Sequence, residues 1–263
     1  YSSAMTPLLR DFLIFTYRQA YACIFWGFLI FMIVLTKYYY PFEWVLYRYD
    51  FLFLSAIVFQ IFLIMTRLES WKEVGIIAIF HAVAMVMEIF KTHPSIGSWT
   101  YPGDFSIGIR GVPLFAGFMY SAVGSYIARV WRIFDFRYTN YPRKIYTILI
   151  ALAIYINFFS HHFIWDFRYV IIGCILLTFG RTQIHFRPNK KYYSMNLAFW
   201  FLLVAFVIWI AENIATYTKV WIYPSQTLVW HMVGIEKITA WFLLMIISFV
   251  LVSLLHRPKP LEK

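Results

Sequence analysis

The chain has 263 residues, of which 62% are hydrophobic and 13% are charged, and its formal net charge is +11. An ordinary soluble domain is about 45–50% apolar and about 25% charged, so this composition argues against a soluble protein and favours the lipid bilayer. The positive charge is not expected to bind nucleic acid, because Lys and Arg flank apolar runs as they do in membrane proteins. Cys23 and Cys174 predict neither a disulfide framework nor a zinc knuckle, since they lie far apart inside apolar runs.

Apolar runs recur along the whole chain and predict one all-α polytopic membrane domain over residues 1–263. A hydrocarbon core of about 30 Å needs roughly 20 apolar residues per helix, whereas a β-barrel needs strands of alternating polarity. After an interfacial lead-in at residues 1–11, we expect about eight transmembrane helices. They are placed near residues 20–36, 51–66, 74–90, 145–159, 169–179, 195–216 and 238–255, and the fourth begins at about residue 113.

The predicted fourth helix carries small residues at helical spacing, namely Gly117, Ser121 and Ser125 on one line and Gly124 and Ala128 on the next. Small residues four apart let two membrane helices approach closely. This pattern therefore predicts a packing face and not a functional site.

Basic residues cluster after the predicted fourth and sixth helices and in the C-terminal tail. The positive-inside rule places these segments, and with them both termini, in the cytoplasm. The loops after the first, third, fifth and seventh helices then lie on the opposite face. Those loops hold His93, Trp99, His161, Trp221 and His231, so the sequence predicts a site at the non-cytoplasmic face.

Similar segments recur at a nearly constant offset and predict an internal duplication, with pseudo-repeats at about 12–132 and 140–255. The aromatic segment at 42–49 resembles the one at 163–169, and Trp99-x-Tyr101-Pro102 resembles Trp221-x-Tyr223-Pro224. Glu88 and Glu212 lie at similar distances before the two W-x-Y-P segments. Since each half holds an even number of helices, the expected arrangement is a parallel 4+4 duplication about an axis along the membrane normal.

Two acidic residues, Glu88 and Glu212, fall near the outer ends of predicted helices, and His81 lies two turns before Glu88. A carboxylate at membrane depth is unfavourable by a few kcal/mol, so such residues usually face a protein interior or a water-filled cavity. These two carboxylates are our candidate acid and base. An alternative is that they cap loops or pair with Lys or Arg near the interface.

A second polar cluster follows the predicted fifth helix and contains Asn157, His161, His162 and Asp166. If the helix continues, Asn157 and His161 share one face, as do His162 and Asp166. The cluster could assist Glu88 and Glu212 as catalytic groups. Alternatively, His161, His162 and Glu88 with His93 could bind a divalent metal such as zinc, iron or manganese, although no HExxH motif is present.

The two W-x-Y-P elements place Trp99, Tyr101, Trp221 and Tyr223 beside prolines that favour turns. Their simplest role is an aromatic belt at the membrane interface. They could also line a substrate pocket together with His81 and Asn157, where aromatic faces stabilise a cation.

The segments FHAVAMVMEIFKTH, GSWTYP, GVPLFAGFMYSAVGSYI, INFFSHHF and IWIAENIAT resemble the YoaT-like bacterial integral membrane family, a family of unknown function. The resemblance extends from about Phe12 to Leu255. It implies a multi-pass protein of the bacterial cytoplasmic membrane and implies no particular activity. A fainter similarity, a Glu that ends a helix before an aromatic turn and a Gly-x-Pro helix start, links the chain to membrane carotenoid cyclases and hydratases.

Three functions are compatible with these patterns. The first is a membrane enzyme acting on a hydrophobic isoprenoid or lipid, with membrane lipids and a hydrophobic small molecule as partners. The second is a small-solute or proton-coupled transporter that uses the same carboxylates as a proton relay. The third is a non-catalytic subunit of a membrane complex. The sequence does not decide whether the protein is an enzyme.

Overall fold

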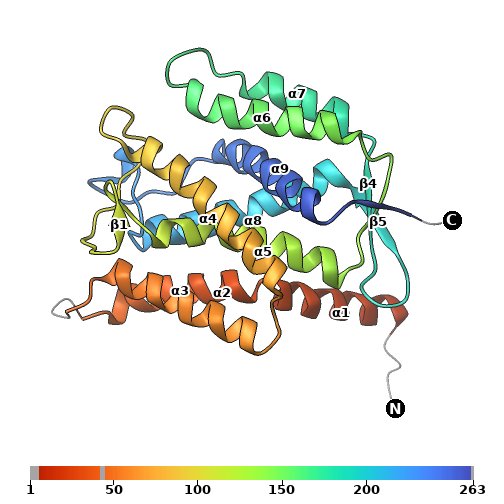
Figure 1. The fold of residues 1–263 in the computed structure, drawn as a ribbon, viewed down its shortest axis with the longest axis horizontal. Helices are drawn as coiled ribbons and strands as arrows, with labels where there is room; N and C mark the ends of the chain where they lie inside the picture. Colours follow the sequence, from red (N-terminus) through yellow and green to blue (C-terminus); the bar gives the residue numbers. More distant parts are fainter. Residues whose placement is uncertain (1–5, 42–44, 262–263) are drawn as a thin grey trace.

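Long apolar runs with no interior proline fold as α-helices throughout the chain, as the sequence predicts. The computed structural model describes residues 6–41 and 45–261, and most of these residues are helical (Figure 1). The helices are α1 (Pro7–Ala22), α2 (Ile24–Tyr39), α3 (Arg48–Met65), α4 (Trp71–Thr92), α5 (Phe115–Ile133), α6 (Lys144–Ser160), α7 (Arg168–Phe179), α8 (Leu197–Tyr217) and α9 (Lys237–Leu255). Short strands are β1 (Gly108–Ile109), β2 (Val112–Pro113), β3 (Arg137–Thr139), β4 (Gln183–Phe186), β5 (Tyr193–Asn196) and β6 (Lys259–Pro260), and η1 (Pro224–Gln226) is a 3₁₀ turn.

The N-terminal segment differs from the expected interfacial lead-in, because a complete helix, α1, precedes the predicted first helix. Thr6 caps it by accepting a hydrogen bond from the Leu9 amide at 3.4 Å, and Pro7 occupies the first turn, where its missing amide hydrogen is tolerated. The chain then bends by 63° at Cys23 and continues as α2.

Four of the described helices, α3, α4, α8 and α9, are long and apolar enough to cross a bilayer, and a fifth crossing results if the bent α1–α2 pair counts as one. About eight crossings were expected. Of the remaining three, α6 and α7 have 17 and 12 residues and are shorter than the criterion for a span. The third, α5, has 19 residues but carries Arg129 and Arg132.

Helix α5 lies at the centre of the bundle, where its small residues let α4 approach, as the sequence predicts. A Cβ atom on Gly124 would lie 2.8 Å from the Phe80 ring, and one on Gly117 would lie 2.6 Å from His81. The His81 ring also stands edge-on to Phe118 at 4.9 Å. His81 therefore packs α4 against α5. The sequence analysis had placed it in a substrate pocket, but it is not among the residues that line the cavity described below.

The close approach of α4 and α5 predicts that Gly124→Ala destabilises the protein by about 1–3 kcal/mol, because the new methyl group has no space beside Phe80. Gly173→Ala in α7 is the matched control, since no atom lies within 4 Å of the added Cβ. The test compares thermal unfolding midpoints of both variants in detergent. Equal midpoints would contradict this account of the α4–α5 contact.

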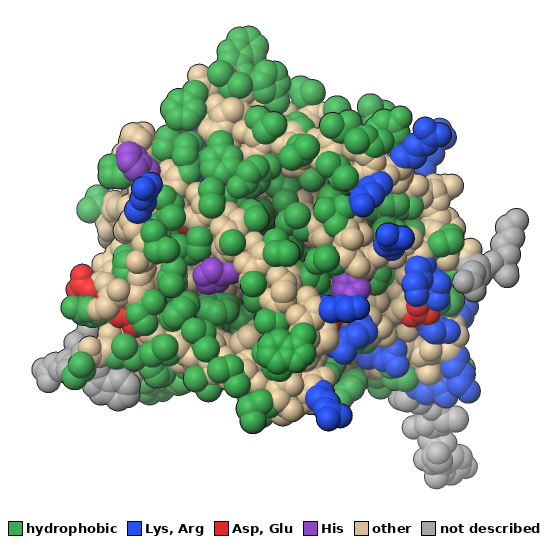
Figure 2. Space-filling model, in the orientation of Figure 1, with side chains coloured by type: hydrophobic (Ala, Val, Ile, Leu, Met, Phe, Trp, Pro, Cys, Tyr) green, Lys and Arg blue, Asp and Glu red, His purple; other side chains and the backbone are tan. Residues whose placement is uncertain are grey.

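The basic loops expected after the fourth and sixth helices form a four-stranded sheet of order β5-β4-β3-β6. Strands β3, β4 and β5 pair antiparallel, and β6 in the C-terminal tail pairs parallel with β3. Both basic loops and the tail thus meet at one end of the bundle, where α1 also begins (Figure 1). Figure 2 shows the Lys and Arg side chains gathered at that end.

A buried ion pair joins the turn between α3 and α4 to the central helix. The Arg129 guanidinium donates to the Glu69 carboxylate at 2.5 Å, and neither side chain is exposed to solvent. Ser125 Oγ donates to the same carboxylate at 2.5 Å, and Gln60 Nε2 also donates to it. This network fixes α3, α4 and α5 relative to one another.

Candidate functional site

The two W-x-Y-P turns meet at the end of the bundle opposite the basic sheet. Thr100 and Ile222 form an antiparallel bridge in which each backbone amide donates to the other residue's carbonyl at 3.0 Å. The Trp99 and Tyr223 rings stand edge-on with their centroids 6.2 Å apart. Residues separated by about half the chain are thus held side by side, with Thr100 opposite its counterpart Ile222 and Trp99 opposite Tyr223.

Buried groups on α3 hold the first turn and its loop in place. The backbone amides of Ser106 and Ile107 donate to the Asp50 carboxylate at 2.8 and 2.9 Å, and Asp50 is buried. The Tyr49 hydroxyl donates to the Val220 carbonyl at 2.6 Å, which ties α3 to the second turn. The site is therefore built on loops that the helical scaffold fixes.

Glu88, near the end of α4, is 1% exposed and accepts three hydrogen bonds. Trp99 Nε1 and the Tyr101 hydroxyl donate to Oε2 at 2.8 and 2.7 Å, and the Tyr120 hydroxyl donates to Oε1 at 2.7 Å. The donors come from the first turn and from α5. Each carboxylate oxygen is thus satisfied by an aromatic N–H or O–H group, an arrangement that suits an ionised carboxylate.

Glu212, near the end of α8, is 2% exposed and has a similar set of donors. The Tyr223 hydroxyl donates to Oε1 at 2.5 Å, and Trp241 Nε1 donates to Oε2 at 2.7 Å. One donor again comes from the following W-x-Y-P turn and the other from the following helix.

The tyrosines of the two turns act as hydrogen-bond donors at neutral pH. Burial, together with the negative charge of Glu88, raises the pKa of Tyr101 well above its ordinary value. Burial and the charge of Glu212 have the same effect on the pKa of Tyr223. Both phenols therefore stay protonated and keep their carboxylates in position.

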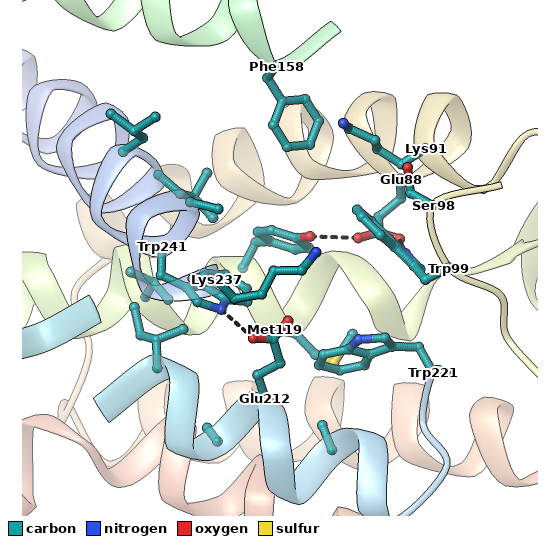
Figure 3. Close-up of a pocket in the computed structure, with 18 of the residues that line it drawn as sticks. Glu88, Lys91, Ser98, Trp99, Met119, Phe158, Glu212, Trp221, Lys237 and Trp241 are labelled. Atoms are coloured by element: carbon teal, nitrogen blue, oxygen red, sulfur yellow. Dashed lines mark hydrogen bonds between the residues drawn. The ribbon is translucent and has the colours of Figure 1, made fainter. Parts of the chain in front are cut away.

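The two carboxylates line one cavity of about 220 Å³ that is bordered by α2, α4, α5, α6, α8, α9, the start of α7 and the two turns (Figure 3). Figure 3 shows Glu88 and Glu212 approaching it from opposite walls, with Lys237 directed between them. Most of the other lining groups are apolar or aromatic. The predicted site residues that line the cavity are Glu88, Trp99, Tyr101, Asn157, His161, Glu212, Trp221 and Tyr223.

The two adjacent histidines at the end of α6 contact Lys91 and not a carboxylate. Lys91 Nζ lies 3.3 Å from His161 Nε2 and 2.7 Å from His162 Nε2, and it lies 4.2 Å from the centre of the Phe158 ring. His161 Nδ1 faces the Asn157 carbonyl at 2.8 Å, so Nδ1 carries the proton and Nε2 accepts from Lys91. The Lys91 amine therefore contacts the Nε2 atoms of both imidazoles, whose ring centres lie 4.1 Å apart.

This contact corrects the predicted metal set of His161, His162, Glu88 and His93. Among the residues that the structure describes, no group of three or more His, Cys, Asp or Glu side chains is placed to hold a metal ion. His93 ends α4 and faces the exposed Ser95, with Nδ1 2.7 Å from Oγ. The sequence could not show that a lysine three residues after Glu88 would contact both histidines.

The expected pairing of His162 with Asp166 does not form, because α6 ends at Ser160 and the two residues lie in the following loop. Asp166 instead accepts a hydrogen bond from Asn157 Nδ2 at 3.0 Å and pairs with Arg168 at 3.2 Å. Asp166 and His162 are not among the residues lining the cavity; His161 is. His231 lies on the exposed second loop, with Nε2 3.0 Å from the Ser225 carbonyl.

The contact with Lys91 predicts a pH effect at His162. Partial burial and the positive charge of Lys91 lower the pKa of His162 from the ordinary 6.5 to about 4. The folded protein therefore binds this proton less well than the unfolded chain, and between those pH values His162 favours unfolding increasingly as the pH falls. In Lys91→Met the pKa is expected to move back toward 6.5.

Carbethoxylation of His162, followed by mass spectrometry across this pH range, tests the effect because the reagent attacks only neutral imidazole. The exposed His93 serves as an internal reference for reagent activity. Wild-type His162 is expected to stay reactive at a pH where the Lys91→Met variant has lost reactivity. Identical profiles in the two proteins would contradict the assigned contact.

The lining residues that were not predicted from the sequence include Tyr120, Trp241 and Lys237. A signal for the first two exists, because Tyr120 and Trp241 occupy matching places in the helices that follow the two W-x-Y-P turns. Both donate to the glutamate of their own half. Lys237 begins α9 and carries no comparable sequence signal.

A helical bundle with several membrane-length helices and a buried acidic cavity defines a polytopic membrane protein. The family model described as "Protein of unknown function (DUF817)" matches residues 11–249, and the chain belongs to this family. The chain is similar to "Uncharacterized protein YoaT" of Bacillus subtilis (strain 168), with 36% identity over 252 residues that cover 95% of this chain and 94% of that protein. No solved structure matches the chain significantly. The family resemblance seen in the sequence is thereby confirmed.

Proposed function

We propose that this protein is a membrane enzyme that acts on a hydrophobic isoprenoid or lipid substrate by proton transfer at Glu88 and Glu212. The observation that carries the proposal is the placement of two buried carboxylates, each held by aromatic donors, on facing walls of one largely apolar cavity. Such a cavity with a few convergent polar groups is the usual form of a small-molecule site.

The chemistry follows from the charges and rings around the cavity. Glu88, with three donors, acts as the base or as the counter-charge to a cation, and Glu212, with two, exchanges the proton with the substrate. Positive charge that develops on a hydrocarbon chain is stabilised by aromatic faces such as Trp99, Trp221 and Trp241. His161 and His162, held with Lys91, fix the rim of the cavity beside Glu88.

The site is proposed to arise from a parallel duplication in which α2–α5 correspond to α6–α9, with eight membrane helices besides α1. Supporting this, Thr100 pairs with its own counterpart Ile222, and Tyr101 and Tyr223 each bind the glutamate of their own half. In both halves the third and fourth helices, α4 with α5 and α8 with α9, form the most extensive contacts. The aromatic residues Phe42 and Trp44, part of the sequence argument, lie outside the described residues.

We further propose that the protein lies in the bacterial cytoplasmic membrane with both termini inside. The basic residues of the β3–β6 sheet gather at one end of the bundle, and the site lies at the other (Figures 1 and 2). The positive-inside rule then directs the cavity to the outer leaflet.

Proton-coupled transport is the second candidate, and the break between α1 and α2 favours it. The pair bends by 63° within a stretch that is apolar enough for one crossing, and broken helices are common at transporter sites. Trp26, just after the break, lines the same cavity as Glu88 and Glu212. A role as a non-catalytic subunit remains the third alternative, with no specific contact in its favour.

Mass spectrometry of lipid extracts from bacteria that produce wild-type protein, Glu212→Gln or Glu236→Gln tests the enzyme proposal. Glu236 is an exposed carboxylate at the start of α9 and serves as the control. A hydrophobic product is expected with wild type and Glu236→Gln, whereas Glu212→Gln is expected to accumulate the precursor. Identical lipid profiles for all three proteins would overturn the proposal, and proton-dependent solute uptake into vesicles would then establish transport.

A further inference from the structure

A second cavity, of about 380 Å³, lies next to the first and toward the basic end of the bundle. Its walls come from α1, α5, α8 and the sheet, and Phe15, Phe134, Trp200 and Val204 are typical of its lining. Gln19 and Tyr126 are among the few polar groups there, and they hydrogen-bond to each other at 3.2 Å. This cavity therefore offers almost no partner to a polar ligand and suits a hydrocarbon chain.

The two cavities share three wall residues, Trp26 of α2, Val123 of α5 and Ile208 of α8. These side chains lie at the boundary between the acidic cavity and the apolar one, which we call the neck. The volumes of about 220 Å³ and about 380 Å³ together fall within the roughly 300–1,000 Å³ that small-molecule sites occupy. A ligand that passes the neck could thus use both spaces.

The opposite end of the acidic cavity is basic. Lys91, Lys237 and Arg168 all line it, and Lys91 lies within electrostatic range of the other two. Lys91 contacts the two histidines, and Arg168 pairs with Asp166 at 3.2 Å. Within the described residues, the Lys237 ammonium forms no hydrogen bond or ion pair, and it lies 4.3 Å from the centre of the Tyr223 ring.

We propose that the two cavities together bind a long-chain lipid phosphate, with the phosphate group at Lys237, Lys91 and Arg168 and the hydrocarbon chain passing Trp26 and Val123 into the apolar cavity. This inference rests on the proposed function and names the substrate class of the same site. A phosphate fits because the Lys237 ammonium has no ion-pair partner among the described residues, and phosphate oxygens accept charge-assisted hydrogen bonds from Lys and Arg side chains.

The direction of the ligand agrees with that of a lipid in a bilayer. Its charged group would lie near the loops at the end of α4, and its chain would point along the bundle toward the opposite leaflet. The part of the chain next to the phosphate would then lie between Glu88 and Glu212, where the proposed proton transfer takes place. A lipid from the leaflet at that end needs no reorientation to enter.

Chain length provides the test of the neck. Native mass spectrometry compares how the purified protein binds geranyl phosphate and geranylgeranyl phosphate. The variant Val123→Phe fills the neck, and Val123→Ala is the control at the same position. Wild type and Val123→Ala are expected to bind the longer chain at least about tenfold more tightly, because each buried methylene contributes roughly a fourfold gain. Val123→Phe is expected to keep short-chain binding and lose this advantage.

Retention of short-chain binding also shows that Val123→Phe is folded. If that variant does not fold, Trp26→Ala replaces it, and widening the neck is expected to increase the advantage of the longer chain. No dependence on chain length in wild type, or an unchanged dependence in either neck variant, would overturn the proposed path.

The phosphate end is tested with Lys237→Met, and Lys219→Met removes a positive charge from the same end of the bundle outside the cavity. Lys237→Met is expected to weaken binding of both prenyl phosphates by about tenfold or more, and the control is expected to bind as wild type does. Geranylgeraniol and inorganic phosphate are the further arms. Binding of the alcohol as tightly as the phosphate, or of inorganic phosphate alone, would overturn the proposal.

These measurements do not depend on turnover. Repeating them in Glu88→Gln separates the two proposals, since this variant is expected to lose turnover and to keep the preference for the longer chain. If no turnover is found but the long-chain phosphate binds, the enzyme proposal is refuted and the lipid-phosphate site stands. Turnover with no chain-length dependence would instead refute the binding path.

Discussion

Replacing Glu88 with Gln is expected to lower substrate turnover by about 100- to 10,000-fold, because the amide neither accepts nor returns the proton. The fold is expected to survive. Trp99 and Tyr101 both donate to Oε2, and the Gln oxygen can accept both of these bonds. The amide nitrogen then faces Tyr120, whose hydroxyl can accept a hydrogen bond once its proton rotates away.

Glu88→Ala separates the structural role of this residue from the chemical one. Removing the carboxylate leaves three buried donors without an acceptor, each at a cost of about 1–3 kcal/mol. The Ala variant is therefore expected to lose both turnover and thermal stability, whereas the Gln variant loses only turnover. The two readouts are product formation by mass spectrometry and the unfolding midpoint in detergent. Wild-type turnover by Glu88→Gln would exclude Glu88 as a proton-transfer group.

The second large effect is expected at the buried ion pair between the α3–α4 turn and α5. Arg129→Met leaves the Glu69 carboxylate buried without its counter-charge, and breaking a buried pair from one side typically destabilises a protein by about 3–5 kcal/mol. Glu69 would still accept from Ser125 and Gln60, but neutral donors do not replace the positive charge. A marked fall in the unfolding midpoint follows.

Arg132→Met is the matched control one turn away on the same helix. The Arg132 side chain is 46% exposed and lies 3.3 Å from Glu73, which also accepts a hydrogen bond from the Ser70 amide, so the loss is expected to be clearly smaller than that of Arg129→Met. The double variant Glu69→Gln/Arg129→Met removes both charges and is expected to recover part of the lost stability. Equal midpoints for Arg129→Met and Arg132→Met would contradict the assigned role of the buried pair.

The meeting of Glu88 and Glu212 in one cavity could be expected from the sequence because both residues precede similar W-x-Y-P turns. The same regularity extends to Tyr120 and Trp241, which the sequence analysis did not include. Asn157 and His161, which the sequence analysis named as candidate site residues, also line the cavity. The function of these residues stays a prediction.

Several contacts could not be expected from the sequence because they join distant segments through side-chain direction. The contact of Lys91 with both histidines is one case, since linear spacing does not show which way a long side chain turns. His81 is another, because it shares a face of α4 with Glu88, but two turns earlier along that face the helix meets Gly117 of α5 and not the cavity. The basic loops gave no strong strand pattern, and their pairing depends on three separated segments.

The sequence by itself indicated a helical membrane protein and the packing face of α5. It also indicated that two acidic residues each precede a similar W-x-Y-P turn. These follow from composition and local periodicity, which act through residues close together in the chain. Only the tertiary structure decided the bend at Cys23, the neck at Trp26 and the cationic end at Lys237. Each of these depends on how helices from both halves pack together, and a cavity is the space that this packing leaves unfilled.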